Sequence, residues 1–247
     1  MAPFGASRAG LMSTRVDAIP DSEADQKLAH RYVLDDINNT ISDSVGEVDG
    51  EVNGVSSTSG DWSGGEAGES DGVDDHISFA PEWDIFESPT DIAIALSVKT
   101  TDNGYRLIEG QEDAGTNEDW IQFGSGIIGD DGGLDMLIRN RGEDEDARIT
   151  TGSNLINDGD PYRIVFNVPS GNTDDWEIWK NQTDQPITIV RSANIPDQSL
   201  TIGLVAAFAG IDSDGVRKHY EGVIDDICIY HTSLTESEIQ SYSNPWD

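Results

Sequence analysis

The sequence predicts an all-β protein, a jelly-roll antiparallel β-sandwich with a short C-terminal helix and an N-terminal arm. Three observations carry this prediction. Short apolar runs alternate with a period of two residues, turns rich in Gly, Asp and Asn separate them, and one segment near the end has helical signals. Six Trp, six Tyr and six Phe supply anchors for a core, which a disordered chain lacks.

The chain divides into an arm, residues 1–27, and a single sandwich domain, residues 28–247. The arm is rich in small residues and has no strand periodicity. Phe4, Leu11 and Met12 nevertheless give it apolar surface to bury, so an arm that docks on another subunit is weighed against a loosely packed terminus. No internal repeat or low-complexity linker indicates a second domain boundary.

About a dozen short strands are predicted after the arm. The clearest is residues 91–100, where Ile92, Ile94, Leu96 and Val98 share one face. Further strands are predicted at residues 30–36, 46–55, 74–81, 104–110, 161–168 and 176–181, and in the runs DWIQFGSGI, LDMLIRN, ITIVRSA, LTIGLVAAFAG and HYEGVIDDICIY. Residues 60–70 and 143–148 are interpreted as loops, the second because its carboxylates lack apolar alternation.

The closing segment TESEIQSYSN predicts the helix. Thr235 is a preferred N-terminal capping residue, and Glu238 three residues later completes a capping box. Pro245 marks where this helix must already have ended.

The charge is strongly unbalanced. The chain has 48 acidic and 14 basic residues, a formal net charge of −34. Self-repulsion of this size destabilises a compact state in low salt, whereas molar salt shortens the Debye length to about 3 Å. The pattern is typical of a protein adapted to a high-salt environment; an acidic calcium-loaded adhesin is the alternative. Clusters of Lys and Arg that bind phosphate are missing, so nucleic acid is not an expected partner.

Cysteine content and hydropathy exclude several other classes. Cys228 is the only cysteine, so an intrachain disulfide is impossible, and its place in an apolar strand predicts a buried, inert thiol. No run approaches the roughly 20 apolar residues of a membrane helix, and the N-terminus lacks the apolar run of a secretory signal. We expect synthesis in the cytoplasm and no membrane insertion.

Two distant segments together resemble the laminin-G-like branch of the concanavalin A-like lectin and glucanase superfamily. In residues 34–54 and 64–79 a strand ending in an acidic residue precedes a Gly-rich turn and the sequence DGVDD. Residues 220–239, YEGVIDDICIYHTSLTESEI, are similar to the closing pattern of the family. DGVDD, residues 71–75, could equally form a turn in which Asp side chains cap backbone N–H groups. The resemblance covers residues 28–245 and implies a concanavalin A-like sandwich.

The resemblance also implies a structural Ca²⁺ site that joins the first and last strands. Its candidate ligands are Asp35 or Asp36, a backbone carbonyl near Gly46, and Asp225. Asp225 and its neighbour Asp226 interrupt the apolar alternation of the last strand, and a buried carboxylate needs a cation or hydrogen-bond donors. Calcium takes six to eight oxygen ligands. The alternative interpretation is that these acids form part of a solvated acidic surface.

Enzymatic activity is not expected. Hydrolases of the superfamily carry alternating carboxylates of the form E-x-D-x-E on one strand, where both carboxylates share a face. The sequence has no such strand, nucleophile elbow, zinc-ligand set or phosphate loop. A glycoside hydrolase is therefore the less favoured alternative. Trp62, Trp83 and Trp120 lie in or beside predicted loops and are candidate platforms for a glycan, with local packing anchors as the alternative.

These observations lead to one hypothesis. The chain resembles structural proteins of haloarchaeal tailed viruses and proviruses, which implies a non-enzymatic virion surface or host-attachment component such as a capsid decoration, turret or tail fibre. Its expected partners are copies of itself and other virion proteins, contacted through the arm, and glycans of the host surface. Its expected location is the virion surface or the extracellular space. The alternative is a soluble or cell-surface lectin of a haloarchaeon.

Overall fold

The computed structural model describes most of the sandwich. The described residues are 27–35, 37–59, 65–79, 91–104, 106–111, 119–125, 133–140, 145–169, 172–185, 187–191, 200, 204–208, 210–212, 215–217 and 219–241. Phe4, Leu11 and Met12 of the predicted arm lie outside them.

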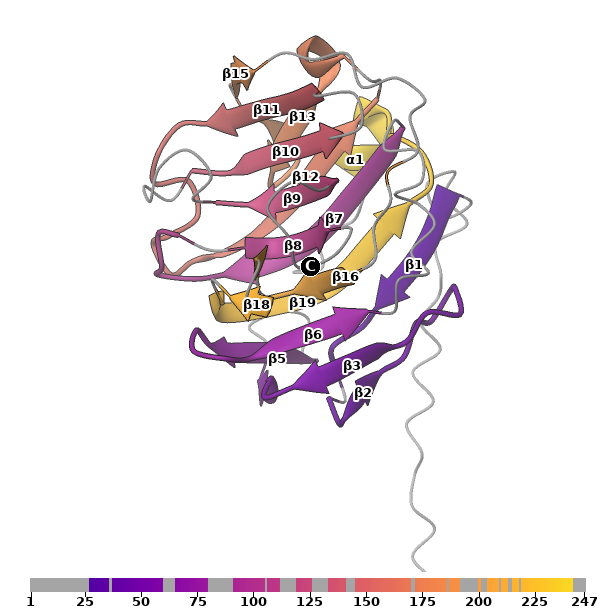
Figure 1. Cartoon of the computed structure of the whole chain (residues 1–247), viewed down its shortest axis with the longest axis vertical. Coiled ribbons are helices and arrows are strands. Elements are labelled where there is room, and N and C mark those ends of the chain that lie inside the picture. The colour runs from indigo at the N-terminus through magenta and orange to yellow at the C-terminus, as the bar shows by residue number, and fades with distance from the viewer. Residues whose placement is uncertain are drawn as a thin grey trace, which may run out of the picture.

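Two antiparallel sheets pack face to face, which confirms the predicted all-β sandwich (Figure 1). Sheet A holds, in spatial order, β14 (Thr183–Asp184), β13 (Glu177–Lys180), β12 (Pro161–Val168), β7 (Ile92–Lys99), β19 (Glu221–Tyr230), β5 (Glu66–Asp71) and β4 (Ser56–Ser59), with β1 (Leu28–Tyr32) also paired to β19. Sheet B holds β15 (Ile187–Arg191), β11 (Glu145–Thr151), β10 (Asp135–Asn140), β9 (Trp120–Gly124), β8 (Arg106–Gln111), β16 (Leu204–Ala207), β6 (His76–Phe79), β3 (Gly50–Asn53) and β2 (Thr40–Ile41). A separate hairpin joins β17 (Gly210–Asp212) to β18 (Gly215–Arg217), and a 3₁₀ turn, η3 (Thr173–Asp175), precedes β13.

Strand β7 shows why the apolar alternation predicted the core correctly. Ile92, Ile94, Leu96 and Val98 all point into the main core between the sheets. The residues between them are also apolar, and Ala93 and Ala95 pack in a second cluster on the outer face of sheet A. A strand buried on both faces has this near-continuous apolar composition.

Two segments that were interpreted as loops are strands. The loop prediction for residues 60–70 is wrong at β5, where Gly68 packs closely on the core: a Cβ there would lie 2.5 Å from Leu34 Cδ2. The loop prediction for residues 143–148 is wrong from Glu145 onward, because β11 begins there. Ala147 and Ile149 of β11 alternate into the core, a pattern that the run of carboxylates before them concealed.

The last strand, β19, carries a β-bulge. Its pairing with β7 shifts register between Asp225 and Cys228, and Asp226 has a φ of 49°. Aspartate is among the few residues other than glycine that adopt this left-handed conformation readily. The interruption of the apolar pattern seen in the sequence is therefore a real break in the strand, and Cys228 beyond it is buried as predicted.

The closing helix α1 (Glu236–Ser241) has the predicted capping box. The backbone N–H of Thr235 donates to Glu238 Oε2 at 2.7 Å, and the N–H of Glu238 donates to Thr235 Oγ1 at 3.4 Å. Lys27 also ties the start of the sandwich to this helix, with its Nζ 2.8 Å from Glu238 Oε1. No helix in the described part of the chain has the length and apolar character needed to cross a membrane.

Candidate functional site

The outer face of sheet B carries polar side chains on four adjacent strands. Along β8 to β11 every second residue, such as Ile108, Ile121 and Ile138, belongs to the main core. The residues between them face outward, and the strand register aligns them in two rows. These rows are Glu109–Gln122–Leu137–Arg148 and Gln111–Trp120–Arg139–Asp146. We call their polar members the sheet-B polar face: Glu109, Gln111, Trp120, Gln122, Arg139, Asp146 and Arg148.

This face is polar and yet largely buried. Glu109 is 1% exposed and Gln122 0%, whereas Trp120, Arg139 and Arg148 keep part of their side chains in solvent. The hairpin that contains β17 packs against β8, and Figure 1 shows β18 in front of this sheet. Glu109 and Gln122 are thus the buried part of the face, and the other three form its solvent-facing rim.

Ion pairs hold the charged members in place. Arg139 Nη2 lies 2.9 Å from Asp146 Oδ2, and Arg148 Nη2 lies 3.7 Å from the same oxygen. At the other side of the face, Arg106 Nε lies 3.1 Å from Glu109 Oε2. Charged groups with this little exposure are retained only when paired, because desolvation of an isolated charge is expensive.

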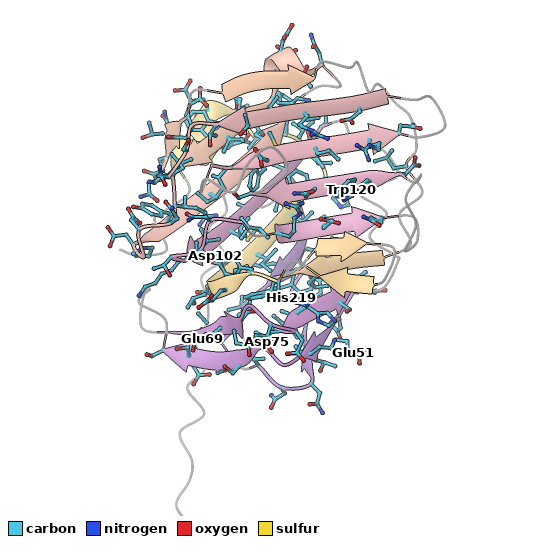
Figure 2. All side chains as sticks on the ribbon, turned by 60° about the vertical axis from the view of Figure 1, so that its left-hand side comes forward. Glu51, Glu69, Asp75, Asp102, Trp120 and His219 are labelled. Carbon is cyan, nitrogen blue, oxygen red and sulfur yellow. The ribbon has the colours of Figure 1, made fainter. Side chains whose placement is uncertain are left out.

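Trp120 provides an aromatic surface at the rim. The guanidinium carbon of Arg139 lies 5.1 Å from the centroid of the Trp120 ring, which is cation–π geometry. This contact and the ion pair of Arg139 with Asp146 together fix the orientation of the indole. Figure 2 shows Trp120 on this sheet, well apart from Glu69 and Asp75.

Two neutral groups of the face have no hydrogen-bond partner among the described residues. They are the side-chain amide of Gln122, both at Nε2 and at Oε1, and the Nε1–H of Trp120. Leaving a buried polar group unsatisfied costs about 1–3 kcal/mol. Native structures keep such groups rarely, and a ligand that completes the hydrogen bonds is one reason to keep them.

The strands that carry the two acidic residues of the face lie farther apart than the paired carboxylates of a glycoside hydrolase. Glu109 lies on β8 and Asp146 on β11, so three strand spacings, about 14 Å, separate the strands that carry them. Paired carboxylates of glycoside hydrolases lie about 5–9.5 Å apart. Each of these carboxylates is also already paired with arginine.

A concavity lies on the opposite sheet. It is a groove of about 780 Å³ between β4, β5, β19 and the end of β7, lined by serine and threonine hydroxyls, by Lys99 and by the carboxylates of Glu69, Asp71, Asp75 and Glu221. No aromatic side chain lines it within the described residues. Among the described residues it has neither a stacking surface nor an unsatisfied buried side-chain group, so the sheet-B polar face is the stronger candidate.

An acidic cluster borders this groove. Asp71, Asp74 and Asp75 bring carboxylate oxygens within 4.8 Å of one another, a donor set that could hold a cation. Asp71 ends β5, and Asp74 and Asp75 lie in the turn that follows it. Asp75 Oδ2 accepts the N–H of Asp71 at 2.9 Å, and Asp71 Oδ1 accepts the N–H of Val73 at 2.8 Å. The DGVDD sequence is therefore the Asp-capped turn that was the alternative to a strand.

The structure brings together two of the residues predicted to bind calcium. Burial raises the pKa of Asp225 to about 6, and the negative charges of Asp226 and Asp35 add to the effect. Asp35 Oδ1 accepts the backbone N–H of Glu66 at 2.9 Å, which places Asp35 beside β5. Asp36 lies outside the described residues.

Gly46 lies elsewhere. A Cβ on Gly46 would meet Asp43 Oδ2 at 2.5 Å and His30 Nδ1 at 2.6 Å, so the glycine packs on the first half of β1, whereas Asp35 follows the end of that strand. Burial alone would raise the pKa of Asp43, but hydrogen bonds from His30 and from the backbone N–H groups of Gly46 and Arg31 hold it below its usual value.

Of the three tryptophans predicted as glycan platforms, the structure describes Trp120 and places it on the sheet-B polar face. Trp62 and Trp83 lie outside the described residues. Apart from Trp120, the members of the face, such as Gln122 and Arg139, were not predicted from the sequence. Their only signal was that polar residues recur at alternate positions of four strands, with Leu137 as an exception, and an ordinary solvated sheet has the same pattern.

No family model matches the sequence, and no curated protein is significantly similar to it. Several solved structures superpose on the chain. Domain 4 of AbnA, a GH43 extracellular arabinanase from Geobacillus stearothermophilus, in complex with arabinotriose, superposes with a TM-score of 0.61 at 18% identity, covering 87% of this chain and 97% of that one. The chain shares the fold of this β-sandwich domain.

Two further structures extend the similarity. Trypanosoma rangeli sialidase matches with a TM-score of 0.57 at 14% identity over 90% of this chain, which spans 33% of the sialidase. The CBM40 of the Ruminococcus gnavus IT-sialidase matches with a TM-score of 0.50 at 14% identity, covering 63% of this chain and 83% of that one. The chain is thus structurally similar to carbohydrate-binding β-sandwich domains, at identities that establish the fold alone.

Proposed function

We propose that this chain is a non-catalytic, laminin-G-like carbohydrate-binding domain whose sheet-B polar face contacts the glycan. The observation that carries the proposal is the buried Gln122 amide, which has no hydrogen-bond partner among the described residues and lies on the same face as the Trp120–Arg139 platform. Sugar hydroxyls both donate and accept hydrogen bonds, as an amide does, and sugar C–H faces pack on an aromatic ring. The arabinotriose complex of a domain with this fold supports the same class of ligand.

Replacing Trp120 by alanine is expected to weaken binding of a neutral oligosaccharide by roughly tenfold or more, since aromatic residues are the usual anchors of a binding surface. Isothermal titration in molar KCl with arabinotriose and with xylo-, cello- and galacto-oligosaccharides would measure this. Trp120→Phe, which keeps a ring but loses the Nε1–H, should give an intermediate effect.

Glu69→Gln is the matched control, because Glu69 lines the groove on the opposite sheet. Its affinity should equal that of the wild type. Loss of binding in Glu69→Gln with full binding in Trp120→Ala would move the site to the groove on sheet A and contradict the proposal.

The structural Ca²⁺ suggested by the sequence fits Asp35 and Asp225. Both offer carboxylate oxygens, and they lie close enough for the charge of Asp35 to raise the pKa of Asp225. A divalent cation would neutralise carboxylates that otherwise repel one another. Asp35 and Asp225 would hold it, and it would tie the segment after β1 to β19. The carbonyl near Gly46 is not placed with them.

We extend the proposal to the setting in which the domain acts: a virion surface or host-attachment component, assembled through the arm and used in high salt. The net charge of −34 and the composition of residues 1–27 support it. The full chain is expected to form a closed oligomer in molar KCl, and a chain that starts at Lys27 is expected to be monomeric. That start keeps the Lys27–Glu238 ion pair, so the sandwich itself is preserved.

Light scattering measures both masses. Equal masses for the two chains would contradict assembly through the arm and favour a monomeric lectin.

A further inference from the structure

We propose that the sheet-B polar face selects an uncharged oligosaccharide chain over an acidic one. This inference rests on the proposed function and names the ligand class of the same face. It follows from three properties of the face: the pairing of its arginines, the hydrogen-bonding groups that the neutral side chains of Gln122 and Trp120 offer, and its length across the strands.

The two arginines of this face, and Arg106 beside it, are already engaged by carboxylates. Arg139 and Arg148 share Asp146, at 2.9 and 3.7 Å, and Arg106 lies 3.1 Å from Glu109. Proteins recognise a carboxylate or sulfate by offering it the paired donors of a guanidinium. An acidic sugar here would have to displace a protein carboxylate from its arginine and leave that carboxylate buried without a partner.

The wider field acts in the same direction. The chain carries a formal net charge of −34, so an anionic ligand is repelled over the whole surface. Molar salt reduces the range of this repulsion to about 3 Å. In molar salt the ion pairs of the arginines on the face therefore determine the selectivity.

Two side chains of the face without a hydrogen-bond partner among the described residues, Gln122 and Trp120, are neutral. Gln122 offers two N–H donors and a carbonyl acceptor, and Trp120 offers one N–H donor. A sugar hydroxyl, which both donates and accepts, can satisfy the amide at both of its ends. A carboxylate accepts only, so it would leave the Gln122 carbonyl unsatisfied.

The face is also longer than one sugar. Its polar members lie on β8, β9, β10 and β11, which span three strand spacings, about 14 Å. Trp120 stands near the middle of this span, with Gln111 on one neighbouring strand and Arg139 on the other. A chain of several sugars that crosses the strands would contact the whole face, whereas a monosaccharide would contact only part of it.

The test compares ligands of equal length and different charge. Isothermal titration in molar KCl would use arabinotriose, cellotriose and galactotriose as neutral probes, trigalacturonate and sialyllactose as acidic ones, and the monosaccharides of each. At least one neutral trisaccharide should bind roughly tenfold tighter than either acidic probe and than its own monosaccharide. Tighter binding of an acidic probe, lost in Trp120→Ala, would overturn this inference and leave the proposed function intact. Failure of every probe to bind would overturn the proposed function itself.

Asp146→Asn provides an independent arm of the test. The variant removes the carboxylate shared by Arg139 and Arg148, so the affinity for trigalacturonate should rise by roughly tenfold while the affinity for neutral probes changes less. Glu69→Gln removes the same charge from the opposite sheet and should leave both affinities unchanged. An equal gain in both variants would assign the selectivity to net charge rather than to the face.

Discussion

Replacing Gln122 by methionine is expected to raise the free energy of unfolding by about 1–3 kcal/mol and to weaken oligosaccharide binding by roughly tenfold or more. The two effects have one cause. The amide of Gln122 is 0% exposed and lacks a partner among the described residues, so it destabilises the ligand-free protein. Methionine has a similar length and shape and no strong polar atoms to desolvate. The substitution therefore removes the cost together with the hydrogen bonds that a ligand would receive.

Urea unfolding of the two proteins in molar KCl, followed by circular dichroism, measures the first effect, and isothermal titration measures the second. Asn167→Leu is the contrasting control. Asn167 is equally buried, but its amide donates to Glu177 Oε2 and to the Leu234 carbonyl, each at 2.9 Å, and accepts the Leu234 N–H at 2.8 Å. It should lose about 3 kcal/mol or more, because two buried backbone groups lose their partner.

A Gln122→Met protein that is less stable than the wild type would show that the amide has a structural partner. Unchanged affinity in that variant would remove Gln122 from the binding face even if its stability rises. A gain in stability with a loss of binding is the combination that a purely structural residue does not produce, and it is typical of residues kept for function at the expense of stability.

The sequence was sufficient for the fold wherever side-chain alternation and local hydrogen bonding decide the structure. The apolar alternation of β7 and the capping box of Thr235 and Glu238 were both predicted correctly, since each depends on residues a few positions apart. Strands β5 and β11 were missed for a physical reason. Gly68 is in β5 because neighbouring side chains leave no room for a Cβ, and β11 begins among carboxylates that arginines of the same sheet neutralise.

The candidate site was predictable only in part. Trp120 could be proposed because a tryptophan at the start of a strand is conspicuous in any sequence. Gln122 could not, because its importance depends on its burial and on the absence of a described partner, and both are visible only in the assembled sheet. Alternation indicates that Gln122 faces away from Ile121 and Phe123, but it does not indicate whether water reaches that face.

Replacing Asp225 by asparagine is expected to raise the free energy of unfolding by about 2 kcal/mol at about pH 8 once divalent cations are removed. Burial, together with the charges of Asp226 and Asp35, raises the pKa of Asp225 to about 6. A shift of this size corresponds to about 3 kcal/mol, which partial solvent exposure reduces. Asparagine keeps an oxygen that can accept the Asp226 N–H, as Asp225 Oδ1 does at 2.7 Å.

The sign of the pH dependence follows from the direction of this shift. Between about pH 4 and pH 6 the folded protein holds a proton on Asp225 that the unfolded chain has released, so Asp225 makes stability fall as the pH rises through this window. The asparagine variant lacks this fall, and the two proteins should differ least near pH 4. Urea unfolding across this range in EDTA tests it, with Asp74→Asn controlling for loss of one exposed charge. Stability curves for wild type and Asp225→Asn that stay parallel across the window would contradict the raised pKa.

Calcium should reverse the order of the two proteins. If Asp225 is a ligand, added Ca²⁺ stabilises the wild type in proportion to the logarithm of its concentration and leaves Asp225→Asn unchanged, so the wild type overtakes the variant. Equal gains in both, lost in Asp74→Asn, would instead place the cation at Asp71, Asp74 and Asp75. A bound cation relieves the repulsion between neighbouring carboxylates, which gives a physical reason for placing Asp225 close to other acids. The crossing of the two stabilities would be the direct sign that the cation binds there.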